Sequence, residues 1–363
     1  MKGKQGLVCM GLLLVLSSCH TGKQITASGL QRKDFQTEVN GQHTDLFTLS
    51  NKQGMEVCIT NYGARVVSIL VPDRNGKRED VVCGFSTITE YMEQRQNFGS
   101  TVGRYIGRIL NARFTLDGVE YKLVPNNGKS GHISHGGNPG FADRIWKVEQ
   151  ADTHRVRLSY LSPDGENGFP GNLKVTLVYS LGEDDNALDL TYEATTDAPT
   201  VLNLSHHSFF NISGNFTKSV EDQQLWVDAD RFTPYDDKKC VTGEYLPVAG
   251  TPLDFRMPHT IGECIDADHP QLKVVNGYDH TWELNTKGDD TRPAAWVYDP
   301  SSGRKMEIFT TEPGMQIYTG NGLKGKMTGK GGIAYPFRSA VCFETMHFQD
   351  SPNQPGFPST RSE

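Results

Sequence analysis

Two adjacent histidines stand within an apolar, strand-like run from Asn203 to Ile212. Successive side chains of a strand point to opposite faces, so His206 and His207 should point in different directions and could not easily bind one metal ion together. Imidazole titrates near neutral pH, so a buried histidine here could donate a proton and take it back during a reaction. The alternative is a pair of structural histidines, and this run alone does not decide between the two interpretations.

A single carboxylate stands in a second apolar run, from Val341 to Thr345. Burying a carboxylate is costly and raises its pKa unless partners compensate, so Glu344 needs a reason to be there. We therefore identify Glu344 as the best candidate for a general base in this chain.

Three further stretches are polar for their surroundings. Arg104 and Arg108 lie four residues apart in a glycine-rich segment and could contact hydroxyls or carboxylates, although ordinary ion pairs are the commoner use of arginine. His132 and His135 have a spacing that metal sites use, but the glycines that follow indicate a loop and no third ligand is nearby, so zinc is not expected. Asp279 could hydrogen-bond a ligand hydroxyl or simply form a turn.

The composition is typical of a turn-rich β protein. The chain has 363 residues with 36% apolar residues, 38 Gly and 18 Pro, enough for one large β domain or two ordinary ones. The net charge of −7 and the lack of a basic patch argue against nucleic-acid binding and against charge-driven adsorption to anionic lipid. No repeat or low-complexity linker follows residue 30, so residues 34–363 are expected to form one domain.

Alternating apolar and polar residues predict half-buried antiparallel strands at Leu173 to Tyr179 and Leu188 to Tyr192. Asp117-Gly118 indicates a tight hairpin turn, and Thr87 with Glu90 indicates a capping box that opens a short helix. The spacing of these signals predicts an all-β fold, a large antiparallel β-sandwich. Further strands are expected at Met55–Thr60, Ala64–Val71, Asp80–Phe85, Leu225–Asp228, Ala295–Tyr298, Met306–Thr310, Met315–Tyr318 and Ala340–Glu344.

The N-terminus has the features of an export signal. Lys2 and Lys4 precede an apolar run from Leu7 to Leu16, which is too short to span a bilayer as a helix. The run ends in Leu16-Ser17-Ser18-Cys19, which resembles the lipobox of bacterial lipoproteins.

This resemblance implies that residues 1–18 are a lipoprotein signal peptide and that Cys19 carries the lipid. Residues 19–33 would then be a polar tether, and the lipid would hold the domain on a membrane of the cell envelope, on the periplasmic side or at the outer surface. An ordinary cleaved signal peptide is the alternative.

Motifs along most of the chain are similar, in the same order, to those of the aldose 1-epimerase (galactose mutarotase) family. The likeness covers essentially residues 34–363. The matching segments are Gly103 to Ile109, Ser134 to Gly137, Asn203 to Asn211, Gly277 to His280, Pro313 to Asn321, Phe343 to Thr345 and Asp350 to Pro355. The resemblance implies a galactose mutarotase-like β-supersandwich whose open cleft binds a monosaccharide and exchanges its α and β anomers.

The resemblance also implies the site residues. The catalytic histidine of the family falls on His207, and its catalytic base falls on Glu344. Substrate contacts carry over onto Arg108, His135, Asp279 and Gln316. Two positions depart from the family: Gly107 stands where the family usually has Asn before the substrate arginine, and His206 replaces an Asn beside the catalytic histidine.

An aromatic side chain is expected to stack on the apolar face of the sugar. Phe209 is taken as the candidate in the site, and the other aromatic residues that could do so are Phe210, Tyr278, Trp282 and Tyr318. Each of these is individually more typical of a protein core.

The residues fit mutarotation on chemical grounds. A base takes the proton of the anomeric hydroxyl while an acid protonates the ring oxygen, and rotation in the open aldehyde exposes the other face. Neither a metal nor another cofactor is required. The alternatives are a non-catalytic carbohydrate-binding lipoprotein of the same fold and a glycoside hydrolase, for which Asp279 would have to be the second carboxylate. The preferred sugar, and whether the protein is a monomer or a homodimer, are left open.

Overall fold

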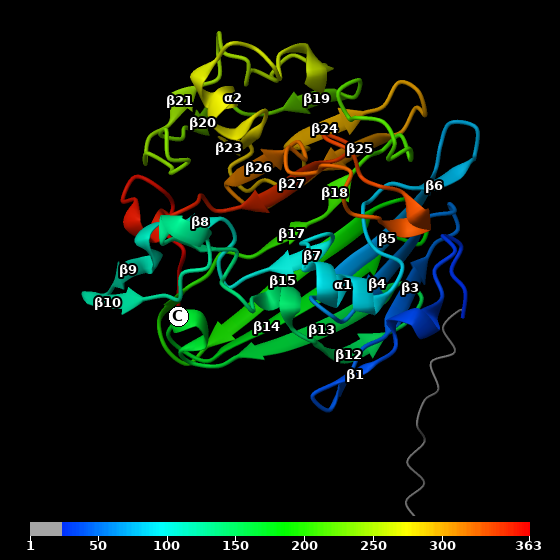
Figure 1. The fold of residues 1–363 in the computed structure, drawn as a ribbon, viewed down its shortest axis with the longest axis horizontal. Coiled ribbons are helices and arrows are strands. Elements are labelled where there is room, and N and C mark those ends of the chain that lie inside the picture. Colours follow the sequence, from blue (N-terminus) through cyan, green and yellow to red (C-terminus); the bar gives the residue numbers. More distant parts are fainter. Residues whose placement is uncertain (1–23) are drawn as a thin grey trace, which may run out of the picture.

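The computed structural model describes residues 24–363, so the expected signal peptide and Cys19 lie outside the described residues. Within this range, antiparallel sheets pack as two sandwiches that lie against each other (Figure 1). The prediction of a large, all-β antiparallel sandwich is confirmed.

The first sandwich, blue and green in Figure 1, pairs two four-stranded sheets. One sheet contains β3 (Leu46–Ser50), β4 (Glu56–Thr60), β5 (Arg65–Pro72) and β6 (Arg78–Asp80). The other contains β12 (Lys147–Ala151), β13 (Arg155–Ser162), β14 (Leu173–Leu181) and β15 (Leu188–Thr196). Alternate residues of β14 face the opposite sheet and are buried with Val57 and Val66, as the alternation in its sequence predicts.

The second sandwich contains most of the C-terminal half of the chain, in yellow to orange in Figure 1. A six-stranded sheet has the order β18 (Phe209–Phe210), β27 (Val341–Met346), β26 (Gly314–Tyr318), β23 (Asp279–Glu283), β20 (Arg231–Thr233) and β21 (Leu246–Pro247). A four-stranded sheet has the order β22 (His259–Thr260), β19 (Gln224–Val227), β24 (Ala295–Tyr298) and β25 (Lys305–Ile308). Trp282, Ile317 and Val297 belong to the core that these sheets share.

Short elements complete the described part of the chain. The two-stranded pairs are β1 (Glu38–Val39) with β2 (Gln42–His43), β7 (Ser100–Val102) with β17 (Ser205–His207), β8 (Arg108–Ile109) with β11 (Ile133–Ser134), β9 (Arg113–Leu116) with β10 (Val119–Lys122), and β16 (Thr200–Val201) with β28 (Arg361–Ser362). The α-helices are α1 (Ile88–Gln94) and α2 (Pro270–Val275). From residue 24 onward, neither helix has the length or the apolar character needed to cross a bilayer.

The local signals in the sequence form as expected. Thr87 accepts a hydrogen bond from the Glu90 amide at 3.2 Å, and the Glu90 carboxylate accepts one from the Thr87 amide at 2.9 Å, so the capping box opens α1. Asp117 and Gly118 both have positive φ, 49° and 82°, which is the conformation that a tight turn between β9 and β10 requires.

One expected strand is wrong. The segment from Asp80 to Phe85 is not a strand beyond Asp80, where β6 ends. Residues 81–85 are all buried, and their pairing is limited to single contacts such as the bridge of Val82 to Phe210. They are apolar because the segment passes from one hydrophobic core to another. A short apolar run has the same sequence pattern in a buried connecting segment as in a buried strand, so the sequence could not separate the two.

Part of the expected tether is packed onto the domain. Thr26 and Leu30 are each 5% exposed, and the amide of Ala27 donates to the Glu56 carboxylate on β4 at 2.6 Å. The packed domain therefore includes Thr26, ahead of the Asp34 boundary that the sequence suggested.

The six-stranded sheet presents a polar face because its polar residues are in register. Glu344 on β27 lies opposite Gln316 on β26, and Gln316 lies opposite Thr281 on β23. Asp279, two residues before Thr281, lies on the same face opposite Tyr318. These side chains therefore gather on one face of the sheet, while the other face packs into the core.

Arg104 anchors the segment that leads into β8 and does not contact a ligand site. Its side chain is 1% exposed and donates to the Ser162 hydroxyl at 2.9 Å and to the carbonyls of Pro170 and Gly171 at 2.7 and 2.8 Å. The suggestion that Arg104 and Arg108 both contact a ligand is thus wrong for Arg104, because its guanidinium satisfies buried backbone carbonyls instead.

The Arg104→Met substitution should lower the free energy of unfolding by about 3 kcal/mol or more, because several buried acceptors lose their donor at once. Chemical denaturation of the domain measures this. Arg155→Met is the control, since Arg155 is exposed on β13, and it should change stability by less than about 0.5 kcal/mol. Equal stability of both variants would contradict the anchoring role of Arg104.

Candidate active site

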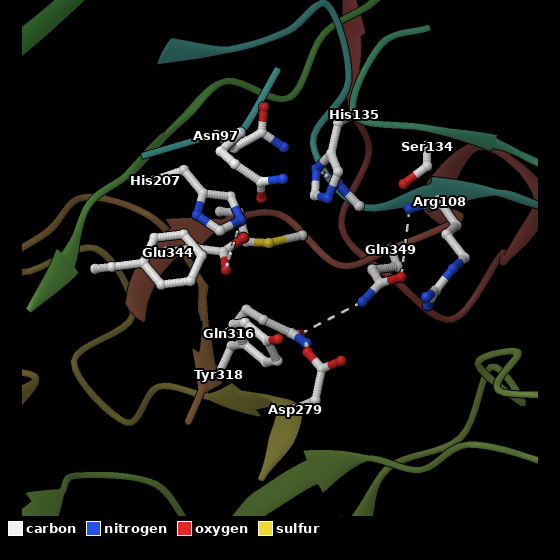
Figure 2. Close-up of a pocket in the computed structure, with 14 residues that line it drawn as sticks. Asn97, Arg108, Ser134, His135, His207, Asp279, Gln316, Tyr318, Glu344 and Gln349 are labelled. Atoms are coloured by element: carbon white, nitrogen blue, oxygen red, sulfur yellow. Dashed lines mark hydrogen bonds and ion pairs between the residues drawn. The ribbon is translucent and has the colours of Figure 1, made fainter. Parts of the chain in front are cut away.

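A cavity of about 260 Å³ opens over the polar face of the six-stranded sheet (Figure 2). All eight residues that the sequence proposed for the site line it: Gly107, Arg108, His135, His207, Phe209, Asp279, Gln316 and Glu344. They come from segments more than 200 residues apart, since β8 and β17 approach the face of β23, β26 and β27. The fold therefore gathers the whole candidate set into one site.

His207 and Glu344 form the centre of the site. Nε2 of His207 lies 3.4 Å from Oε1 of Glu344, and the residues are 6% and 4% exposed. The other ring nitrogen of His207, Nδ1, is buried without a hydrogen-bond partner. The Nε2 edge is therefore the one that can exchange a proton with the carboxylate or with a ligand between them.

Burial shifts the two pKa values in opposite directions. It raises the pKa of Glu344 well above the usual value, and the charge of Asp279 adds to this effect. Burial lowers the pKa of His207 to about 4. These shifts favour a protonated carboxyl and a neutral imidazole, so the pair carries one titratable proton, on the side of Glu344.

His135 and Phe209 surround the ring of His207. The rings of His135 and His207 meet edge to face with centroids 5.5 Å apart, and Phe209 stacks on His207 at 5.1 Å. Burial lowers the pKa of His135 to about 3, so this imidazole is neutral. Because its Nδ1 accepts the Gly107 amide at 3.4 Å, the proton of the neutral ring lies on Nε2.

Gln316 and Asp279 form a hydrogen-bonded pair on the sheet. The amide of Gln316 donates to Oδ1 of Asp279 at 2.6 Å, and the Thr281 hydroxyl donates to Oε1 of Gln316. Burial raises the pKa of Asp279, while the nearby charge of Arg108 and the Gln316 contact lower it. The guanidinium of Arg108 makes a long hydrogen bond to the Lys239 carbonyl, at 3.4 Å. Together with Oδ2 of Asp279 it can meet the hydroxyls of a ligand.

The remaining sequence candidates divide clearly. Phe209 and Tyr318 line the cavity, whereas Tyr278 and Trp282 are fully buried in the core of the second sandwich and Phe210 packs against it. His206 points away from the cavity, as the strand alternation predicted, and its ring contacts Ser208 at 2.6 Å. His132 contacts Sγ of Cys240 at 3.3 Å and does not join His135 in the cavity.

Sequence reasoning missed several residues that line the cavity: Gln96, Asn97, Ser134, Met346 and Gln349. Three of them lie next to motifs that were identified, since Ser134 precedes His135, Met346 follows Glu344 by two residues on the same strand face, and Gln349 follows shortly after. Period-two spacing from Glu344 could have indicated Met346. Gln349 directly precedes the matched segment Asp350 to Pro355, but it lies beyond the end of β27, so strand spacing could not indicate its direction.

Among the described residues, His207, Cys342 and Glu344 form a group whose potential metal-binding atoms lie within 4.8 Å of one another. Burial raises the pKa of the Cys342 thiol well above its usual value, and a protonated thiol is a poor ligand. An ion here would also occupy both groups that can move a proton. These three residues are therefore poorly suited to hold a catalytic metal ion, and an ion bound by them would block proton transfer by His207 and Glu344.

Comparison with known proteins gives consistent matches across the domain. A family model described as aldose 1-epimerase matches residues 45–363. Galactose mutarotase from Sus scrofa is 39% identical over 312 residues, covering 86% of this chain and 88% of that protein. Aldose 1-epimerase from Escherichia coli (strain K12) is 35% identical over 319 residues, covering 88% and 90%.

Solved structures agree with the sequence matches. An aldose epimerase homologue from C. elegans has a TM-score of 0.80 at 30% identity, covering 88% of this chain and 94% of that one. Galactose 1-epimerase from Lactobacillus acidophilus has a TM-score of 0.77 at 27% identity, covering 90% and 94%. With its sandwich fold, its matched domain and the gathered site, this chain belongs to the aldose 1-epimerase family.

Proposed function

We propose that this chain interconverts the α and β anomers of a free aldohexose such as galactose or glucose, with Glu344 as base and His207 as acid. The observation that carries the proposal is the separation of 3.4 Å between Nε2 of His207 and Oε1 of Glu344 in a polar cavity. The cavity, about 260 Å³, is smaller than the roughly 300 Å³ at which sites for drug-sized ligands begin, which suits one sugar ring. Membership of the family supports the same activity.

In the reaction, the Glu344 carboxylate takes the proton of the O1 hydroxyl as the C1–O5 bond breaks and C1 becomes an aldehyde. The electron pair of that bond goes to O5, which takes a proton from the His207 imidazolium. Rotation about C1–C2 presents the other face of the aldehyde. On closure O5 attacks C1, its proton returns to His207, and O1 takes the proton back from Glu344.

The pair already holds the one proton that this cycle needs. Moving that proton from Glu344 to His207 converts the neutral pair into carboxylate and imidazolium without exchange with solvent. A sugar hydroxyl that donates to Glu344, and a ring oxygen that accepts from His207, favour the charged form. His135, whose ring lies beside His207 and carries its proton on Nε2, provides a further donor close to the charge that develops on the sugar oxygens.

The rival function is carbohydrate binding without catalysis. It would need the same cavity and the contacts of Arg108 and Asp279, but it gives no reason to bury an acid and a base in contact. The buried pair of His207 and Glu344 therefore favours the enzyme.

Glu344→Gln and His207→Asn should each lower kcat for mutarotation by at least about 100-fold, because each removes one of the two proton-transfer groups. Polarimetry on freshly dissolved α-galactose and α-glucose measures the rate above the spontaneous reaction. Both variants should keep the thermal stability of a folded domain.

His347 and Glu312 provide a matched control pair. Nδ1 of His347 lies 2.7 Å from Oε2 of Glu312, and the side chains are about one-third exposed, away from the cavity. Glu312→Gln and His347→Asn should leave kcat unchanged. A normal rate in a folded Glu344→Gln domain would disprove the assigned base, and a wild-type domain that binds sugars without accelerating mutarotation would support the binding module.

The pH profile of kcat/KM should be bell-shaped and wide, because the active pair holds exactly one proton. Activity falls as the pH drops through the lowered His207 pKa of about 4, where a second proton binds. Activity falls again as the pH rises through the raised Glu344 pKa, where the shared proton leaves. Polarimetry across a broad pH range, corrected for the spontaneous rate, measures both limbs. An acid limb near the usual pKa of histidine would contradict the assignment.

We further propose that the protein is a lipoprotein anchored through Cys19 on a membrane of the cell envelope. The lipobox-like sequence from Leu16 to Cys19, after a short apolar run with preceding lysines, supports this. Thr26 is already packed onto the domain, so an anchor at Cys19 would hold the domain close to the membrane surface.

The full-length chain expressed in a bacterium should incorporate a clickable fatty acid and sediment with membranes. Cys19→Ser should abolish the label and release the protein, whereas Cys9→Ser, inside the expected signal peptide, should keep both. A wild-type chain that is cleaved, unlabelled and soluble would show instead that an ordinary signal peptide is present.

A further inference from the structure

Gln349 occupies the space directly over Gly107. The backbone of Gly107 has φ +74°, and a Cβ added there would lie 2.6 Å from Cγ of Gln349. Gln349 itself is 5% exposed and lines the cavity beside Arg108. Position 107 must therefore lack a side chain for the Gln349 side chain to lie where it does.

Hydrogen bonds fix the orientation of the Gln349 amide. Its Nε2 donates to the Tyr235 hydroxyl at 2.7 Å and lies 3.4 Å from Oε1 of Gln316, while its Oε1 accepts the amide of Arg108 at 3.3 Å. A carbonyl oxygen has two lone pairs, so Oε1 keeps one acceptor site, and the long contact to Gln316 leaves one N–H weakly engaged. Gln349 can thus pair with a hydroxyl that both donates and accepts.

The position of Gln349 in the cavity indicates which hydroxyl of the sugar it can contact. Figure 2 shows His207 and Glu344 on one side of the cavity and Gln349 with Arg108 on the other. In a pyranose ring the atoms opposite C1 and O5 are C4 and C3. A sugar whose C1 and O5 meet the proton-transfer pair therefore turns its C3 and C4 hydroxyls toward Gln349.

We propose that Gln349 binds the C3 or C4 hydroxyl of the sugar and, with the gap left by Gly107, sets the selectivity between aldoses that differ on that edge. Galactose and glucose differ only in the configuration at C4. The inference rests on the proposed function for the orientation of the sugar, but it concerns binding and not the proton transfers.

Gln349→Met keeps the length of the side chain and removes the amide, so it tests the hydrogen bonds without opening a large cavity. Loss of the amide should raise KM for the better hexose about tenfold and change kcat less than KM. A contact with the C4 hydroxyl also predicts a shift of the galactose-to-glucose ratio of kcat/KM, whereas a contact with the C3 hydroxyl predicts an unchanged ratio. Gln150→Met, on the exposed face of β12, is the control and should change none of these.

Deoxy sugars identify the contact. Isothermal titration with galactose, 3-deoxygalactose and 4-deoxygalactose should show that wild type loses affinity for one of the deoxy sugars, and that Gln349→Met binds that sugar as well as wild type does. The inference is overturned if the substitution weakens all three sugars equally, or none of them. Binding is read without turnover, so a wild-type domain that fails to catalyse mutarotation would refute the proposed function while this comparison still decides the role of Gln349.

Gly107→Ala gives a second, independent measurement. The added methyl group should displace Gln349 and reproduce the rise in KM, with a smaller further effect when Gln349→Ala has already freed the space. Thermal melting of each variant separates this result from unfolding at the positive φ. An unchanged KM for both hexoses in a folded Gly107→Ala domain would contradict the proposal.

Discussion

The site depends on the burial of two ionisable groups in contact. Burial away from solvent disfavours the charged form of both His207 and Glu344, so it raises the pKa of Glu344 and lowers that of His207. The pair therefore carries one titratable proton, and a ligand is needed to stabilise the form in which both groups are charged. That arrangement suits a reaction in which ring closure reverses ring opening, because the group that takes a proton in one step gives it back in the other. The charge of Asp279 in the same cavity favours the proton on Glu344, while the neutral ring of His135 beside His207 adds no further charge.

The fold meets this constraint by building one polar face on a sheet whose other face is core. Glu344, Gln316 and Thr281 lie in register on adjacent strands, and neighbours on the opposite face, namely Phe343, Ile317 and Trp282, are buried and apolar. The polar groups of Gln316 are taken up by Thr281 and Asp279, so the floor of the cavity is rigid before any ligand binds. Arg104 holds the opposite wall by satisfying the carbonyls of the first sandwich.

Much of the fold was predictable because alternation with period two and turn residues are local signals. They identified β14, the hairpin at Asp117 and the helix that begins after Thr87. The same reasoning failed for residues 81–85, because an apolar run inside a crossing segment looks like a strand. It also placed the domain start too late, because the contacts that bury Thr26 and Leu30 are made with distant strands.

The sequence by itself identified the family and predicted the eight residues that line the cavity, including the proposed acid and base, because these are carried by residue types in a recognisable order. Only the tertiary structure decided that Arg104 is structural while Arg108 reaches the cavity, that His207 and not His206 faces Glu344, and that Gln349 fills the space over Gly107. Each of these depends on contacts between residues far apart in the chain. Local pattern specifies which way a strand turns its side chains, but packing specifies what they meet.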